Sequence, residues 1–364
     1  MTRDYSGFFP ASATSPSKSV RASPLEELGW QPFFAQQISA DDLMRTPPVR
    51  VVEVHRSGLH ARGQDIDREL PPRTDATVGD WLLFDADHPA SSRLLDRKSL
   101  LQRRAPGKGR QVQLIAANID TAFVVSSCNQ DFNIARLERY IALAFEAEIT
   151  PVIVLTKSDL ASDAEVYAER ARSISDRVAV VSLDARGEEP GSKLAEWCKA
   201  GRTVAFLGSS GVGKSTLTNA LIGSDAIATQ GIREDDAKGR HTTTRRQLHL
   251  VPGGCLVLDT PGMRELQLTD VASGIDDLFA DVNALAATCR FNDCAHKSEP
   301  GCAVQEAIRE GQLDESRLNR WRKLKAEEAF NSATLAERRS KDKAFGKMVR
   351  GIMKQKAQKN WDGG

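Results

Sequence analysis

Residues 208–215 read Gly-Ser-Ser-Gly-Val-Gly-Lys-Ser and match the pattern G-x-x-x-x-G-K-[ST], which is typical of loops that wrap a phosphate group. Glycines let backbone N–H groups surround the phosphate, and the following helix adds a favourable dipole. Lys214 can neutralise the β and γ phosphates, and the Ser215 hydroxyl can ligate Mg²⁺. A glycine-rich structural turn is the alternative. We predict a phosphate site formed by Gly208, Ser209, Ser210, Gly211, Val212, Gly213, Lys214, Ser215 and Thr216.

A second motif, Asp259-Thr-Pro-Gly262, follows the apolar run 255–259. In P-loop proteins a carboxylate at such a strand end holds Mg²⁺ through water, and the glycine N–H can sense the γ phosphate. The same four residues alone would be a common turn. Their position downstream of a phosphate loop favours the functional interpretation, with Ser215 and Asp259 as the magnesium residues.

The position that carries a water-orienting glutamine in Ras-like proteins holds Met263, which cannot orient water. Our candidate for that role is His241, in the segment Arg240-His-Thr-Thr-Thr244. One of its threonines would complete the Mg²⁺ shell, so Thr243 and Thr244 join Lys214 as catalytic candidates. An ordinary exposed loop histidine is the alternative for His241.

The tetrapeptide Thr156-Lys157-Ser158-Asp159 lies at the end of the apolar run 151–155. A carboxylate there can accept hydrogen bonds from guanine N1–H and its C2 amino group, whereas adenine offers neither, so Asp159 selects guanine. Ser182, after another apolar run, would bring a backbone N–H to guanine O6. A helix-capping Asp159 in an ATPase is the alternative, and competition between guanine and adenine nucleotides separates the two.

The order of these motifs is unusual, because the guanine-reading residues precede the phosphate loop. If the sheet keeps an ordinary site, the chain enters it at a different strand, which is a circular permutation. The segment that senses the γ phosphate then leads directly into the C-terminal part of the chain, so the nucleotide state could be passed to it.

Cys289, Cys294, His296 and Cys302 form the pattern C-x4-C-x-H-x5-C. Three thiolates and an imidazole supply a complete tetrahedral Zn²⁺ shell with no open position, which indicates a structural site. Cys128, Cys198 and Cys255 lie in or next to apolar stretches and are expected to be core residues.

The elements that must position these residues divide the chain into four parts. Residues 1–48 are expected to be a largely disordered tail, and the short alternating runs of residues 49–112 predict a small β barrel, although a small sheet of another topology would show the same pattern. Apolar strands alternating with helices over 113–275 predict a mainly parallel sheet covered on both faces. Residues 276–364 predict a mainly helical zinc-binding unit with a basic tail.

The charge of this chain is distributed unevenly. From Arg320 onward there are 13 Lys and Arg against 5 Asp and Glu, although the net charge of all 364 residues is only +1. A basic tail suits a polyanionic partner such as RNA, and a solvated helix surface is the alternative. No apolar run is long enough to span a bilayer, so we expect a soluble, cytoplasmic protein and no membrane partner.

The combination of the permuted motifs with Gly239-Arg-His-Thr-Thr-Thr244, with Ala117-Asn-Ile-Asp120 and with the Cys/His cluster resembles the RsgA family of small ribosomal subunit biogenesis GTPases. The likeness covers roughly residues 50–325. It implies an OB barrel, a circularly permuted GTPase domain and a zinc domain. It also implies a role in late maturation of the small ribosomal subunit. The protein would bind the rRNA of that subunit, and the subunit would stimulate hydrolysis of GTP to GDP. We expect the protein to be a monomer. A nucleotide-gated RNA-binding scaffold with little hydrolysis is the alternative.

One residue departs from the family pattern. Thr156 stands where most members carry asparagine. A hydrogen bond to the base or to a supporting loop is therefore lost or made by the hydroxyl instead, whereas guanine selection by Asp159 is expected to survive.

Overall fold

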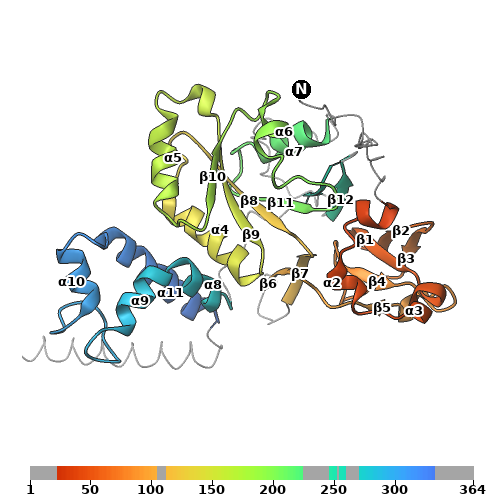
Figure 1. Ribbon diagram of the computed structural model, residues 1–364, viewed down its shortest axis with the longest axis horizontal. Helices are drawn as coiled ribbons and strands as arrows, with labels where there is room; N and C mark the ends of the chain where they lie inside the picture. Colours follow the sequence, from red (N-terminus) through yellow and green to blue (C-terminus); the bar gives the residue numbers. More distant parts are fainter. Residues whose placement is uncertain (1–22, 105–111, 224–245, 252–253, 260–269, 333–364) are drawn as a thin grey trace, which may run out of the picture.

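The computed structural model describes residues 23–104, 112–223, 246–251, 254–259 and 270–332. A central sheet with helices on its faces lies between a strand-rich N-terminal unit and a group of C-terminal helices (Figure 1). Among the described residues, no helix is both long and apolar enough to cross a membrane.

The central sheet has the strand order β10-β9-β8-β11-β13-β12, in which every neighbouring pair is parallel except β12 and β13. All residues of β8 and β11 are buried, as expected for strands covered on both faces. The predicted mainly parallel sheet is therefore confirmed. Its strands are β8 (Thr121–Ser127), β9 (Thr150–Thr156), β10 (Ala179–Ser182), β11 (Thr203–Leu207), β12 (Arg246–Leu250) and β13 (Leu256–Asp259).

Alternate residues along these strands pack against different helices, because side chains of a strand point to opposite faces. Val124 and Leu155 belong to the core cluster that contains α4 and α5 residues. Phe123 and Val154 belong to the cluster that contains Leu194, which follows α6, and Leu217 of α7. The covering helices are α4 (Ile134–Glu146), α5 (Ala164–Arg172), α6 (Glu189–Lys193) and α7 (Lys214–Ile222).

The N-terminal strands form a small antiparallel sheet that joins the central one through β1 and β12, where Glu53 pairs with Gln247. β1 also pairs with β2 and β4, β2 with β3, and β4 with β5. In the described part of the chain β6 and β7 pair only with each other. These strands are β1 (Pro48–His55), β2 (Gly58–Gly63), β3 (Asp67–Leu70), β4 (Trp81–Leu83), β5 (Arg93–Leu94), β6 (Leu100–Arg104) and β7 (Val112–Ala117).

Three short helices lie inside the segment that the sequence analysis expected to be a largely disordered tail: α1 (Pro24–Glu27), α2 (Pro32–Ala35) and α3 (Ala40–Arg45). Ser23 and Ser39 each form a capping box, and Phe34 is buried against the β unit, where its ring lies 5.8 Å from that of Trp81. The expectation was therefore wrong for residues 23–48, because packing stabilises helices too short to persist alone. Residues 1–22 lie outside the described part of the chain.

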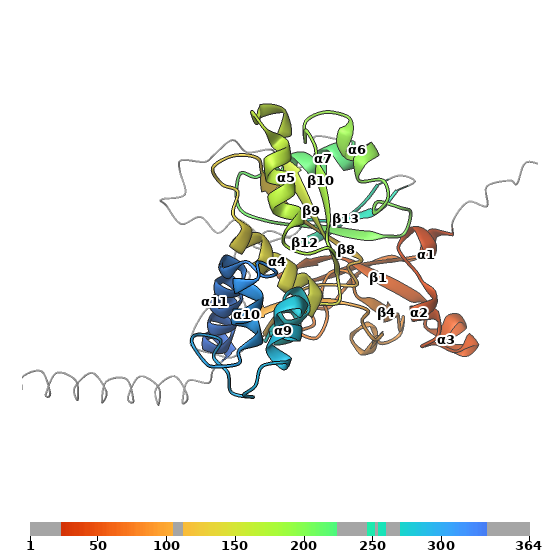
Figure 2. The same cartoon turned by 60° about the vertical axis from the view of Figure 1, so that its left-hand side comes forward.

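Of the C-terminal helices, α8 and α11 pack on α4 of the central unit, and Figure 2 shows α11 beside it. Gly274 of α8 allows the closest approach, since a Cβ there would lie 2.0 Å from the Ala142 carbonyl oxygen. Between residues 270 and 332, the part of this unit that the structure describes, the chain is mainly helical as predicted. The helices there are α8 (Ala272–Leu278), α9 (Ala280–Ala287), α10 (Ala303–Arg309) and α11 (Glu315–Ser332).

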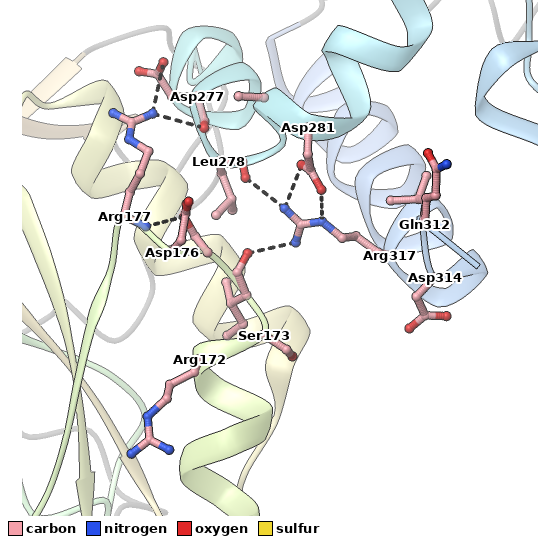
Figure 3. A pocket seen from close by; sticks show the side chains of 14 residues that line it. Arg172, Ser173, Asp176, Arg177, Asp277, Leu278, Asp281, Gln312, Asp314 and Arg317 are labelled. Carbon is pink, nitrogen blue, oxygen red and sulfur yellow. Dashed lines mark hydrogen bonds and ion pairs between the residues drawn. The ribbon is translucent and has the colours of Figure 1, made fainter. Parts of the chain in front are cut away.

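A polar seam separates α8, α9 and α11 from the segment between α5 and β10, and it contains a cavity of about 330 Å³. Arg317 of α11 crosses this seam (Figure 3). Its guanidinium donates to both carboxylate oxygens of Asp281 and to the carbonyls of Leu278 and Ile174, the last at 2.9 Å. The C-terminal helices are thereby fastened to the backbone of the central unit.

Candidate functional site

Because β9, β11 and β13 run parallel, the residues that follow them lie at one edge of the sheet. Thr156 ends β9, Gly208 follows β11 and Asp259 ends β13. β8 leads to α4 and β11 leads to α7, and these two helices belong to different core clusters and so cover opposite faces of the sheet. Ligands of open α/β sheets bind at this kind of position.

The phosphate loop has the backbone conformation that its glycines permit. Gly208, Gly211 and Gly213 have φ values of +145°, +77° and +97°, which residues other than glycine rarely adopt. A Cβ on Gly208 would lie 2.4 Å from the Val125 carbonyl oxygen. Gly213 is the N-cap of α7, and Lys214 folds back so that its Nζ donates to the Gly208 carbonyl at 2.8 Å and to that of Ser209.

Thr156 joins the base-reading segment to the phosphate loop. Its side chain is fully buried, and its hydroxyl donates to the Val212 carbonyl at 2.6 Å and lies 3.3 Å from that of Ser126. The hydroxyl therefore supplies a contact to a supporting loop, which is one of the outcomes expected for threonine at this position.

Asp159 follows a backbone reversal in which Lys157 has a φ of +57°. Ser158 and Asp159 lie in the short 3₁₀ turn that comes next. The Asp159 carboxylate accepts a hydrogen bond from Arg186 Nη2 at 2.7 Å. Arg186 was not among the predicted site residues. Its position four residues after Ser182, at the end of a strand expected to contribute to the base site, was the only sequence feature that pointed to it.

Ser182 ends β10, beside β9, and its carbonyl accepts from Lys193 Nζ at 2.9 Å. In the loop that follows, the backbone N–H groups of Leu183, Asp184 and Arg186 donate to Leu155, Glu189 and Asp184. Among the described residues, the Ala185 N–H has no acceptor in this loop.

Arg136 is a second residue that the sequence analysis missed. It lies in the first turn of α4, after the capping residue Asn133, and its Nη1 donates to the Ser209 hydroxyl at 2.9 Å. α4 therefore contacts the phosphate loop at its start. An arginine on a helix surface gives no sequence signal for this contact, because only the packing of α4 brings it there.

The Cys/His cluster is assembled as its spacing predicts. The ligand atoms of Cys289, Cys294, His296 and Cys302 all lie within 4.8 Å of one another. His296 Nδ1 is 3.5 Å from Cys289 Sγ and 3.6 Å from Cys302 Sγ, and the two sulfurs are 3.9 Å apart. A tetrahedral Zn²⁺ with ordinary bond lengths places sulfurs about 3.8 Å apart and sulfur and nitrogen about 3.6 Å apart. The four residues can therefore hold a tetrahedral metal ion.

Neighbouring residues fix the histidine of this cluster. Its carbonyl accepts from Gln305 Nε2 and from Arg322 Nη2 of α11, each at 2.6 Å, and its φ is +56°. Burial lowers the pKa of His296, and the positive charge of Arg322 lowers it further. Both effects favour the neutral imidazole that binds metals.

The remaining predicted site residues are described only in part. His241, Thr243 and Thr244 fall within residues 224–245, and Gly262 and Met263 within 260–269, both outside the described residues. For Asp259 the backbone is described and the side chain is not. Ser215 and Thr216 are in the first turn of α7, and the Ser215 side chain is exposed.

The strand order, phosphate loop and permuted sequence of motifs define a circularly permuted P-loop GTPase. The family model described as RsgA GTPase matches residues 94–269. A small ribosomal subunit biogenesis GTPase RsgA 2 of Vibrio parahaemolyticus is 50% identical over 341 residues, 92% of this chain and 94% of that protein. An RsgA of Mesorhizobium japonicum is 53% identical over 329 residues, 88% of this chain and 92% of that protein.

Two solved structures share the fold. YjeQ from Thermotoga maritima has a TM-score of 0.54 and 25% identity, and the match covers 76% of this chain and 96% of that one. YloQ, described as a circularly permuted GTPase, has a TM-score of 0.53 and 23% identity over 79% of this chain and 97% of its own. The chain belongs to the RsgA family of GTPases and is a GTP-hydrolysing enzyme.

Proposed function

We propose that this GTPase acts in late maturation of the small ribosomal subunit, binds its rRNA, and checks or releases the subunit when GTP is hydrolysed. The relatives that share about half of their residues with this chain bear the corresponding names. The observation that supports the nucleotide part of the proposal is the hydrogen bond from Thr156 to Val212, since it joins the segment proposed to read the base to the phosphate loop. In this role the protein would work in the cytoplasm as a monomer.

In the proposed nucleotide complex, Asp159 reads the guanine edge and the Ala185 N–H, in the loop after Ser182, donates to O6. Residues 208–216 hold the phosphates, and Lys214 leaves its carbonyl partners for the β and γ oxygens. Ser215 and Asp259 would hold Mg²⁺, which neutralises phosphate charge. His241, with Thr243 or Thr244, remains the candidate for orienting the attacking water.

The two flanking units complete the proposal. Residues 49–112 would form the OB-type barrel, a class of fold that often binds oligonucleotides. The Cys/His cluster would hold one structural Zn²⁺, because its donor set and spacing suit that ion. Both units, together with the basic C-terminal segment, would supply contacts to RNA.

The deciding experiment measures GTP hydrolysis with and without purified small ribosomal subunits, with zinc assayed on the same protein. We expect strong stimulation and one zinc per chain. An unchanged rate would favour the nucleotide-gated scaffold, with which Met263 at the glutamine position is compatible. The variant His241→Ala tests the catalytic assignment: unaltered subunit-stimulated turnover would remove His241 from it.

A further inference from the structure

The carboxylate that is proposed to read guanine has a partner within the chain. Arg186 Nη2 lies 2.7 Å from Asp159 Oδ2, which is the distance of a charge-assisted hydrogen bond. The side chain of Arg186 is 64% exposed and that of Asp159 is 29% exposed, so the pair is open to solvent.

The loop between β10 and α6 holds Arg186 in this position. Asp184 Oδ1 accepts the backbone N–H of Arg186 at 2.9 Å and lies 3.5 Å from its Nε. The Asp184 N–H in turn donates to Glu189 at the start of α6, also at 2.9 Å. The guanidinium is therefore presented to Asp159 by a loop with its own hydrogen bonds.

A guanidinium and the edge of guanine offer a carboxylate the same chemistry. Each is planar and presents N–H donors on nitrogens bonded to one carbon, and each can bind a carboxylate through two hydrogen bonds. Guanine needs both oxygens of Asp159, and Oδ2 is already accepting from Arg186. Both groups therefore draw on Oδ2, and a bulky guanidinium bonded there competes with the base for access to this oxygen.

We propose that Arg186 is an internal competitor for the guanine base, which guanine displaces from Asp159 on binding. The inference rests on the proposed base-reading role of Asp159. Exposed ion pairs contribute little free energy, so the competition weakens guanine nucleotide binding about two- to five-fold. Its main effect is on association, because the pair must open before the base can enter.

The variant Arg186→Gln, titrated with fluorescently labelled GDP, tests this competition. We expect two- to five-fold tighter binding through faster association, and a difference from wild type that closes between about 0.05 M and about 1 M salt as the ion pair is screened. The matched control is Arg172→Gln, an exposed arginine of α5 paired with Glu165, which should bind GDP as wild type does. Unchanged or weaker GDP binding by Arg186→Gln would overturn the proposal.

The variant Asp159→Asn separates this inference from the proposed function. An amide at position 159 should favour xanthosine diphosphate over GDP; if it does not, the base-reading role fails and the competition fails with it. If preference does switch, adding Arg186→Gln should leave xanthosine diphosphate affinity unchanged, since the ionic partner is gone. An equal gain in that background would show that Arg186 acts elsewhere.

Discussion

At the scale of single residues, this site depends on polar side chains whose partners are backbone groups. Thr156 contacts the carbonyl of Val212, and Lys214 contacts that of Gly208. Such contacts help to set the shape of the phosphate loop. Threonine at position 156 supports the loop because its buried hydroxyl reaches the Val212 carbonyl.

The variant Thr156→Val should weaken GDP binding about ten-fold, because valine has the shape of threonine but leaves the buried Val212 carbonyl without a donor. Equilibrium titration with fluorescently labelled GDP measures the change. Thr156→Ser keeps the hydroxyl and should retain most of the affinity. Wild-type affinity in the valine variant would mean that the contact does not support the loop.

At the scale of elements, α4 connects the nucleotide site with the C-terminal helices. Its first turn meets the phosphate loop through Arg136. On its buried face, the two carboxylate oxygens of Glu138 share the single N–H of Arg320 Nε, at 2.9 and 3.0 Å. Arg139 also pairs with Glu327 of α11. Burial raises the pKa of Glu138, although Arg320 and Arg317 oppose that rise. Glu138 therefore tolerates ionisation in the folded protein mainly because α11 covers it with arginines.

Removing Arg320 should expose this dependence. Arg320→Met should destabilise the protein by about 3 kcal/mol at pH 8, because Glu138 is then left buried and poorly compensated. Folding raises the pKa of this carboxyl, so the folded protein is most stable when Glu138 is protonated. The loss of stability in the variant should therefore shrink as the pH falls towards 5. Urea unfolding at several pH values measures this trend.

Two further variants test the cause. Adding Glu138→Gln to Arg320→Met should restore part of the stability, since the buried charge is removed. Arg309→Met, which loses only an exposed contact to Glu306 on the same helix, should change stability by less than about 0.5 kcal/mol. A deficit that is independent of pH would contradict the role of Glu138.

At the scale of the whole molecule, Arg50 joins three parts of the chain. Its buried guanidinium donates to the Leu28 carbonyl after α1, at 2.6 Å, and to the Gly79 carbonyl of the β unit, at 3.2 Å. It also donates to Asn118 and Thr203 at the start of the central sheet. Burial lowers the pKa of Arg50 to about 10, so the group stays charged at neutral pH.

Arg50→Met should lower the free energy of unfolding by about 3 kcal/mol or more, because several buried acceptors lose their donor at once. Urea unfolding at pH 7 provides the measurement. Arg93→Met, at an exposed arginine that pairs with Asp42, is the control and should stay within about 0.5 kcal/mol of wild type. If the two variants unfold alike, Arg50 does not hold these parts together.

Motifs with strict local geometry could be predicted from the sequence. The phosphate loop needs glycine at positions of positive φ, and the metal cluster needs four donors close along the chain, so Gly213 and His296 were identifiable without coordinates. The parallel strands were equally readable, because burial on both faces leaves continuous apolar runs. The helices α1 to α3 were missed although Ser23 and Ser39 carried capping signals, since their stability comes from packing.

Contacts between distant segments were decided only by the tertiary structure. Asp159 and Arg186 are 27 residues apart, and Arg320 lies 182 residues beyond Glu138. Whether such side chains meet depends on strand order and helix packing, and neither can be predicted from residue type alone. The sequence by itself thus determined which chemical groups the site contains. The tertiary structure determined which charged residues lie next to those groups, because electrostatic partners interact according to their distance in space and not along the chain.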